Sequence, residues 1–259
     1  MHPESRRRTL GFVSEAPKLG ARLRAAVLEV GLAIFGLLIG TVLFWVFSAL
    51  GLLPTEGALG RGVQMAAGPA ITLIAALSYR ALNKYIDAND NPMLGSPRRE
   101  DAPFTRSAVG VSIGIAALGI GAAIGGSYIL GLGLDAVGAP VEEQASIVEL
   151  VEGFKSGGDM LPFVMLAISA VALAPMAEEF LFRGLVFRRI AERGNTLPEA
   201  FILSAAAFAS IHTNPAGFVI YLWLGVVFAE SYRRSGRLWV AMLVHAGNNA
   251  FALTLLVSG

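Results

Sequence analysis

The chain has 259 residues, of which 55% are hydrophobic and only 15% are charged, and its formal net charge is +1. In soluble domains about a quarter of the residues are charged, so this composition excludes an ordinary soluble domain. There is no cysteine, which excludes disulfide scaffolds, thiolate metal sites and cysteine nucleophiles.

Long apolar runs predict an all-α polytopic membrane protein, because a spanning helix needs about 20 mostly apolar residues. The fifth and sixth of seven runs are shorter than this, so they are tilted, extended by their flanks, or joined by a break inside the membrane at Asn214-Pro215. The predicted spans are residues 25–53, 63–82, 107–134, 161–187, 199–211, 216–229 and 238–257.

The distribution of charge predicts the orientation of these spans. Of the 20 basic residues, all but Arg61 and Lys155 fall on one side of the predicted membrane, and cytoplasmic loops carry the excess of Lys and Arg. We therefore expect a cytoplasmic N-terminus and an external C-terminus in a plasma (inner) membrane. The predicted organisation is a basic cytoplasmic N-terminus (1–24), three N-terminal spans (25–134) with a cytoplasmic linker (83–106), an acidic external loop (135–160) and a C-terminal transmembrane region (161–257).

The fourth run contains charged residues, which are costly within a bilayer and mark functional sites. Glu178 and Glu179 follow Pro175, and Arg183 lies four residues beyond Glu179. This spacing places Glu179 and Arg183 on one helical face as a pair, whereas Glu178 is rotated by about 100° and is free to face a cavity. Because proline lacks an N–H, we expect the carbonyl of Val171 to be freed and the helix to bend or loosen before the two glutamates.

Two histidines lie in or at the end of apolar runs. His212 follows Phe208 by four residues, and His245 precedes Asn249 by four, so His245 and Asn249 share a helical face. A single histidine at such a position is more often a packing residue than a catalyst. An unpaired glutamate, two histidines and an asparagine on three successive helices together favour a functional site. Glu29, in the first run, is expected to snorkel or to face a neighbouring helix.

Three motifs carry a resemblance to a known family. E-E-x-x-x-R at 178–183, F-x-x-x-H at 208–212 and H-x-x-x-N at 245–249 resemble the signature motifs of the CPBP family, which includes CAAX prenyl endopeptidases and Abi-type, bacteriocin-processing intramembrane proteases. The resemblance covers roughly residues 160–257. It implies a bundle of about 7–8 transmembrane helices around a polar cavity, with a further short helix expected between residues 141 and 154.

The resemblance also implies roles for the site residues. Glu178 would be the general base, His212 would help to hold the water, and His245 with Asn249 would bind the oxyanion. The supporting residues would be Glu179, Arg183 and Phe208. A second interpretation is a metalloprotease in which Glu178, His212 and His245 bind a divalent metal, zinc, and leave one position open for water. No cofactor is certain from the sequence.

The function expected from the resemblance is hydrolysis of a peptide bond in a membrane-anchored or lipidated polypeptide, either CAAX-like or bacteriocin-related. The expected partners are this substrate and the lipid bilayer; the basic residues follow the membrane sides, which argues against nucleic acid. Two alternatives stay open: a proton- or ion-coupled transporter, although no internal repeat is found, and a non-proteolytic immunity or scaffold protein.

Overall fold

The structure is a computed structural model that describes residues 19–88, 106–141, 144–158, 160–212 and 214–259. Within these ranges every regular element is a helix, as predicted. The elements are α1 (Leu19–Ala49), α2 (Gly57–Ala88), α3 (Val109–Ala136), α4 (Ala145–Lys155), α5 (Met160–Ile168), a π-helical segment (Ser169–Leu173), α6 (Ala174–Glu179), a second π-helical segment (Phe180–Phe187), α7 (Arg188–Glu192), α8 (Leu197–Ser210), α9 (Phe218–Ser235) and α10 (Leu238–Ser258).

Five helices in the described residues are long and apolar enough to cross a membrane: α1, α2, α3, α10 and the continuous helix Met160–Glu192, which comprises α5, α6, α7 and both π segments. The protein is therefore an integral membrane protein. The predicted shortness of the fifth run is confirmed, since α8 has 14 residues. The sixth run, α9, has 18 residues and ends with Arg233 and Arg234 in its last turn.

The connections differ from the predicted boundaries in two places, and a third contains a predicted helix. Residues 83–88 of the expected linker belong to α2, and residues 89–105 lie outside the described residues. Residues 19–24 of the expected N-terminal segment belong to α1, and residues 1–18 are likewise outside the description. The expected external loop contains α4, the short helix predicted between residues 141 and 154.

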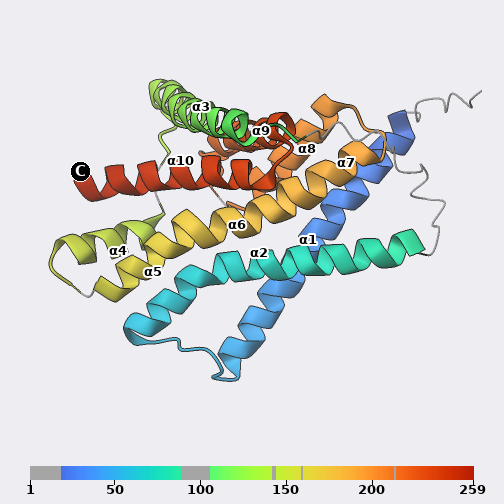
Figure 1. Cartoon of the computed structure of the whole chain (residues 1–259). Coiled ribbons are helices and arrows are strands. Elements are labelled where there is room, and N and C mark those ends of the chain that lie inside the picture. The colour runs from blue at the N-terminus through green and yellow to red at the C-terminus, as the bar shows by residue number, and fades with distance from the viewer. Residues whose placement is uncertain (1–18, 89–105, 142–143, 159, 213) are drawn as a thin grey trace, which may run out of the picture.

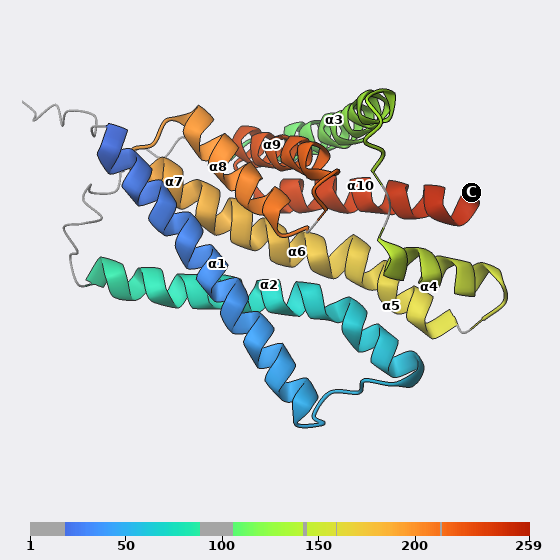
Figure 2. The same ribbon diagram turned by 180° about the vertical axis from the view of Figure 1, so that it is seen from behind.

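The helix Met160–Glu192 runs between α2 on one side and α10 on the other, as both views show (Figures 1 and 2). On the α2 side, α1 crosses α2 at a close contact. A Cβ atom built on Gly36 would lie 2.8 Å from the carbonyl oxygen of Ala75, and one on Gly40 would lie 2.7 Å from that of Ile71. Small residues permit such close backbone approach between membrane helices, so the two glycines fix where α1 meets α2.

Basic residues at the ends of two helices contact neighbouring segments. Arg22 near the start of α1 pairs with Glu199 in the first turn of α8 at 3.2 Å, and Arg237 Nε donates to the carbonyl of Ser107, before α3, at 3.1 Å. The start of α1 and the C-terminal end of α10 lie at opposite ends of the bundle (Figure 1). Each of these two contacts thus joins segments that the sequence assigns to the same side of the membrane.

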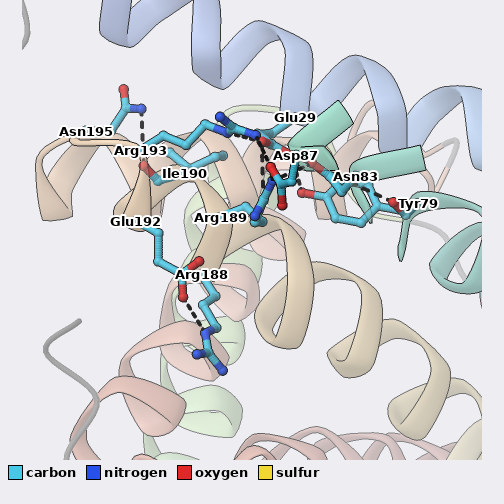
Figure 3. A network of polar contacts seen from close by, with 10 residues as sticks. All are labelled: Glu29, Tyr79, Asn83, Asp87, Arg188, Arg189, Ile190, Glu192, Arg193 and Asn195. Carbon is cyan, nitrogen blue, oxygen red and sulfur yellow. Dashed lines mark hydrogen bonds and ion pairs between the residues drawn. The ribbon is translucent and has the colours of Figure 1, made fainter. Parts of the chain in front are cut away.

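A buried ionic network joins α1 and α2 to the end of the helix Met160–Glu192 (Figure 3). The side chain of Glu29 is fully buried; it accepts hydrogen bonds from the hydroxyl of Tyr79 at 2.5 Å and from Nε of Arg193 at 2.6 Å. Asp87, at the end of α2, accepts from Nη2 of Arg189 at 2.7 Å and from Nη2 of Arg193 at 3.3 Å. Glu29 therefore faces neighbouring helices, one of the two expectations for it.

Candidate active site

The helix Met160–Glu192 is regular only in part, and its irregular parts flank the two glutamates. One π-helical segment, Ser169–Leu173, precedes Glu178 and Glu179, and the other, Phe180–Phe187, follows them directly. A π turn rotates the residues after it relative to those before it, and such turns recur at functional sites. The expected irregularity before Pro175 is therefore present as a change of helical type.

Glu178 faces His212, and the two side chains come from different parts of the chain. Oε2 of Glu178 lies 4.0 Å from Nε2 of His212. This separation is too long for a direct hydrogen bond. Oε2 of Glu178 is buried and has no hydrogen-bond partner among the described residues. Because buried polar atoms normally have a partner, this pair of atoms is where a water molecule or a polar substrate group is expected.

The neighbours of His212 fix the state of its ring. Its Nδ1 lies 2.9 Å from the carbonyl oxygen of Phe208. A carbonyl only accepts, so Nδ1 carries the proton, and in the neutral ring Nε2 is an acceptor directed toward Glu178. The ring also stacks on Tyr221 of α9 at 4.1 Å between centroids. The sequence contains no local signal for Tyr221, which was missed as a residue of this site.

Glu179 faces different residues from Glu178, and one of its two carboxylate oxygens has two partners. Its Oε1 accepts from Nη1 of Arg183 at 2.9 Å and lies 2.9 Å from Nδ1 of His245. The side chains of Glu179 and Arg183 are both fully buried. The predicted pairing of Glu179 with Arg183 is present in the structure, whereas the contact with His245 was not predicted.

Arg183 connects this carboxylate to the surrounding helices. Its Nη2 donates to the carbonyl oxygen of Gly225 on α9 at 2.9 Å. Its guanidinium carbon lies 4.5 Å from the ring centroid of Phe208 and 5.3 Å from that of Phe228. Contacts of a cation with aromatic faces are favourable, and more so away from water. Arg183 is thus held by a carboxylate, a carbonyl and two rings.

Phe208 lies between the two histidines. Its ring centroid is 4.6 Å from that of His212 and 5.7 Å from that of His245. Counting residues along straight helices places these histidines at different depths. They converge because α8 ends at Ser210 and the chain turns before α9, so that His212 lies in the turn itself.

His245 and Asn249 lie one turn apart on α10 but contact different groups. His245 faces Glu179, whereas Nδ2 of Asn249 donates to the carbonyl oxygen of Ala170 at 2.9 Å. We expected both to point to one position in a cavity, and in the structure each has its own partner on the helix Met160–Glu192. The reason is that the π segment exposes a backbone carbonyl to α10, and a side-chain motif does not predict such an acceptor.

The zinc alternative requires Glu178, His212 and His245 to form one coordination group. In the part of the chain that the structure describes, no three His, Asp or Glu side chains form a group that could hold a metal ion. Glu178 and His212 face each other, while His245 directs Nδ1 to Glu179. The contact of Nδ1 with Glu179 leaves Nε2 as the nitrogen of His245 that could bind a metal, so the zinc alternative stays a prediction.

The fold and the site together define an all-helical polytopic membrane protein with a buried Glu, His and Arg centre. Residues 160–251 match the family model of the type II CAAX prenyl endopeptidase Rce1-like family. This region of the chain, which contains all three motifs, is similar to that family of membrane proteases, and the resemblance seen in the motifs is confirmed.

Relatives in several bacteria match over a similar part of the chain. YdiL of Bacillus subtilis (strain 168) is 26% identical over 128 residues, 49% of this chain and 46% of YdiL. The UPF0177 protein YaiH of Lactococcus lactis subsp. lactis (strain IL1403) is 36% identical over 100 residues, 38% of this chain and 40% of YaiH. The membrane-embedded CAAX protease MroQ of Staphylococcus aureus (strain USA300) is 29% identical over 99 residues, 36% of this chain and 39% of MroQ.

The chain thus aligns with less than half the length of each of these relatives. No solved structure matches it. The similarity is confined to part of the chain, and the family model matches its C-terminal region.

Proposed function

We propose that this protein is an intramembrane endopeptidase that hydrolyses a peptide bond of a membrane-anchored polypeptide with a water molecule activated by Glu178. The observation that carries the proposal is the 4.0 Å separation between Oε2 of Glu178 and Nε2 of His212. Both atoms are acceptors when Glu178 is ionised and His212 is neutral. One water molecule can donate a hydrogen bond to each of them and keep its oxygen lone pairs for attack.

The reaction then balances with one proton carrier. The water oxygen attacks the carbonyl carbon of the scissile bond, and Glu178 takes one proton from the water as the carbon–oxygen bond forms. Collapse of the tetrahedral intermediate breaks the carbon–nitrogen bond, and Glu178 returns the proton to the leaving amine. The remaining proton of the water stays with the new carboxyl group, which ionises into solvent.

In this proposal His245 stabilises the oxyanion of that intermediate. Its Nδ1 faces the carboxylate of Glu179, so Nδ1 carries a proton, and Nε2 becomes a donor when the ring is protonated. Arg183 donates to the same carboxylate oxygen of Glu179. A donor fixed in a buried site stabilises a developing oxyanion more than water does.

The substrate class rests on the family description and on MroQ, which are named for CAAX proteolysis. We propose a prenylated polypeptide with a C-terminal CAAX sequence as the first substrate to test; a bacteriocin-related polypeptide is the second. Because the scissile bond must reach Glu178 within the membrane-spanning helix, a lipid anchor would hold it at that depth.

We also propose an orientation with the basic helix ends in the cytoplasm and the C-terminus outside, in the plasma (inner) membrane. The distribution of the basic residues along the sequence supports this arrangement, because cytoplasmic ends retain basic residues.

The proposal is tested with the full chain purified in detergent and a farnesylated fluorogenic peptide that ends in a CAAX sequence. We expect cleavage by the wild type and loss of cleavage in Glu178→Gln and His212→Ala, each with an unchanged elution profile. The same assay with and without a chelator separates direct glutamate chemistry, which is insensitive, from the zinc alternative. Cleavage by Glu178→Gln at the wild-type rate would refute the proposed base.

A further inference from the structure

Two prolines in adjacent helices each remove a backbone donor. One of the two carbonyls left unpaired contacts the π segment Ser169–Leu173, and the other belongs to it. In α2, Pro69 cannot donate to the carbonyl of Met65, four residues earlier. The hydroxyl of Ser169 donates to that carbonyl oxygen at 2.6 Å. A side chain of the π segment therefore replaces the donor that proline lacks.

The second proline lies directly after the π segment, and the helical register determines which carbonyl it leaves unpaired. The N–H of Ala174 donates to the carbonyl of Ser169, five residues earlier, which is the π-helical pattern. In this register the next residue, Pro175, would donate to Ala170. Since proline has no N–H, the unpaired carbonyl is that of Ala170, one residue before the Val171 carbonyl expected for an α-helix.

Nδ2 of Asn249 donates to this carbonyl of Ala170 at 2.9 Å. The amide of a side chain on α10 thus occupies the position of the missing backbone donor. Ser169 and Asn249 hold the π segment from opposite sides, through α2 and α10 respectively. Glu178 follows three residues after Pro175, so the register of this segment sets the direction in which the glutamate points.

We infer that Asn249 is a positioning residue: through its hydrogen bond to Ala170 it holds the π register that directs Glu178 toward His212. This inference rests on the proposed function, and it differs from the oxyanion role implied by the resemblance, in which Asn249 would touch the substrate. The two roles predict different responses to Pro175. If the role of Asn249 is to donate to the carbonyl of Ala170, a backbone N–H at position 175 can take over that role. If Asn249 instead donates to the oxyanion, a backbone N–H at position 175 cannot compensate for its loss.

The test compares Asn249→Ala, Pro175→Ala and the double variant, using the farnesylated CAAX peptide. In Asn249→Ala, Ala170 loses its donor, and we expect kcat to fall about 10- to 100-fold with little change in KM, because small misplacements of a catalytic group have effects of this size. In the double variant, the N–H of residue 175 donates to Ala170, and kcat returns to within a few-fold of Pro175→Ala. A double variant as slow as Asn249→Ala overturns the inference.

A second measurement does not depend on activity. Hydrogen–deuterium exchange of the peptides covering residues 169–180 is expected to rise in Asn249→Ala and in Asn249→Asp, whose carboxylate has the same size but no donor, and to fall again in the double variant. Thr254→Ala is the control, because Thr254 is an exposed residue of α10 whose hydroxyl donates within its own helix.

The outcomes separate the two proposals. A wild type that cleaves nothing contradicts the proposed function, and exchange then decides the placement of Asn249. If Pro175→Ala is itself inactive, hydrogen–deuterium exchange likewise decides whether Asn249 holds the π segment. Exchange at residues 169–180 that is equal in wild type, Asn249→Ala and Asn249→Asp overturns the inference.

Discussion

The hydroxyl of Tyr79 lies 2.5 Å from Oε2 of Glu29, and both side chains are buried between α1 and α2. The other oxygen of Glu29 accepts from Arg193, 164 residues later in the chain. The matched family region begins at residue 160, so this carboxylate connects a part of the chain outside that region to the helix that carries Glu178. The N-terminal helices are thus joined to the site helix by charge as well as by apolar packing.

Replacing Glu29 with glutamine is expected to destabilise the whole bundle. Arg193 and Arg189 would lose one of the two carboxylates that balance their charge, Asp87 being the other, and removal of one partner from a buried ion pair typically costs about 3–5 kcal/mol. The free energy of unfolding in mixed micelles measures this change. Glu56→Gln is the control, because Glu56 is exposed before α2. Equal stability of the two variants would show that the network contributes nothing.

The adjacent glutamates are expected to respond in opposite ways to the same substitution. Glu178→Gln removes a buried carboxylate whose Oε2 has no partner among the described residues, so stability should be unchanged or higher, while kcat falls about 10²- to 10⁴-fold. Glu179→Gln removes the charge that holds Arg183 and His245, so stability should fall. Thermal unfolding and cleavage measured on both variants check this, and a destabilised Glu178→Gln contradicts it.

Arg183→Lys is expected to lose both stability and activity although the charge is kept. A lysine ammonium is a compact donor without the planar fork of arginine, and it cannot reach Glu179, the carbonyl of Gly225 and the Phe208 ring together as Arg183 does. Melting temperature and kcat are the measurements. Arg188→Lys, on an exposed side chain of the same helix, should leave both near the wild-type values; equal behaviour of the two variants would remove the geometric argument.

The proposed orientation is testable because the chain has no cysteine, so every labelled thiol is one that was introduced. In intact cells, a membrane-impermeant maleimide is expected to label Ser156→Cys and Ser258→Cys, both exposed, and to leave Arg234→Cys unlabelled until the cells are opened. If Arg234→Cys alone were labelled in intact cells, the orientation would be the reverse of the one proposed.

The helices were predictable from the sequence because their signal is local. Each apolar run corresponds to a helix, and the motif spacings place Glu179 with Arg183 correctly. The side chain of Glu29 shows the limit of such reasoning. Its partners Tyr79 and Arg193 are 50 and 164 residues away, and no local pattern connects them.

The contacts of the site were harder to predict because they depend on backbone register. The motif alone predicts that His245 and Asn249 point to one position. In the structure Asn249 donates to the carbonyl of Ala170 in the π segment, and His245 contacts Glu179. Pro175 indicates an irregular helix, but the choice between α and π register depends on packing against α2 and α10. The roles of Glu178, His212, His245 and Asn249 stay predictions until the variants are measured.

The burial of Glu29 also bears on the order in which the chain is made. At about 5–20 residues per second, its partner Arg193, 164 residues later, leaves the ribosome about 10–30 s after it. During that interval α1 and α2 are already available to insert, and the hydroxyl of Tyr79 and the amide of Asn83 are the donors that α2 offers to this carboxylate. The hairpin of α1 and α2 therefore supplies its own hydrogen-bond donors to a charge that is neutralised only when the helix carrying Glu178 is made.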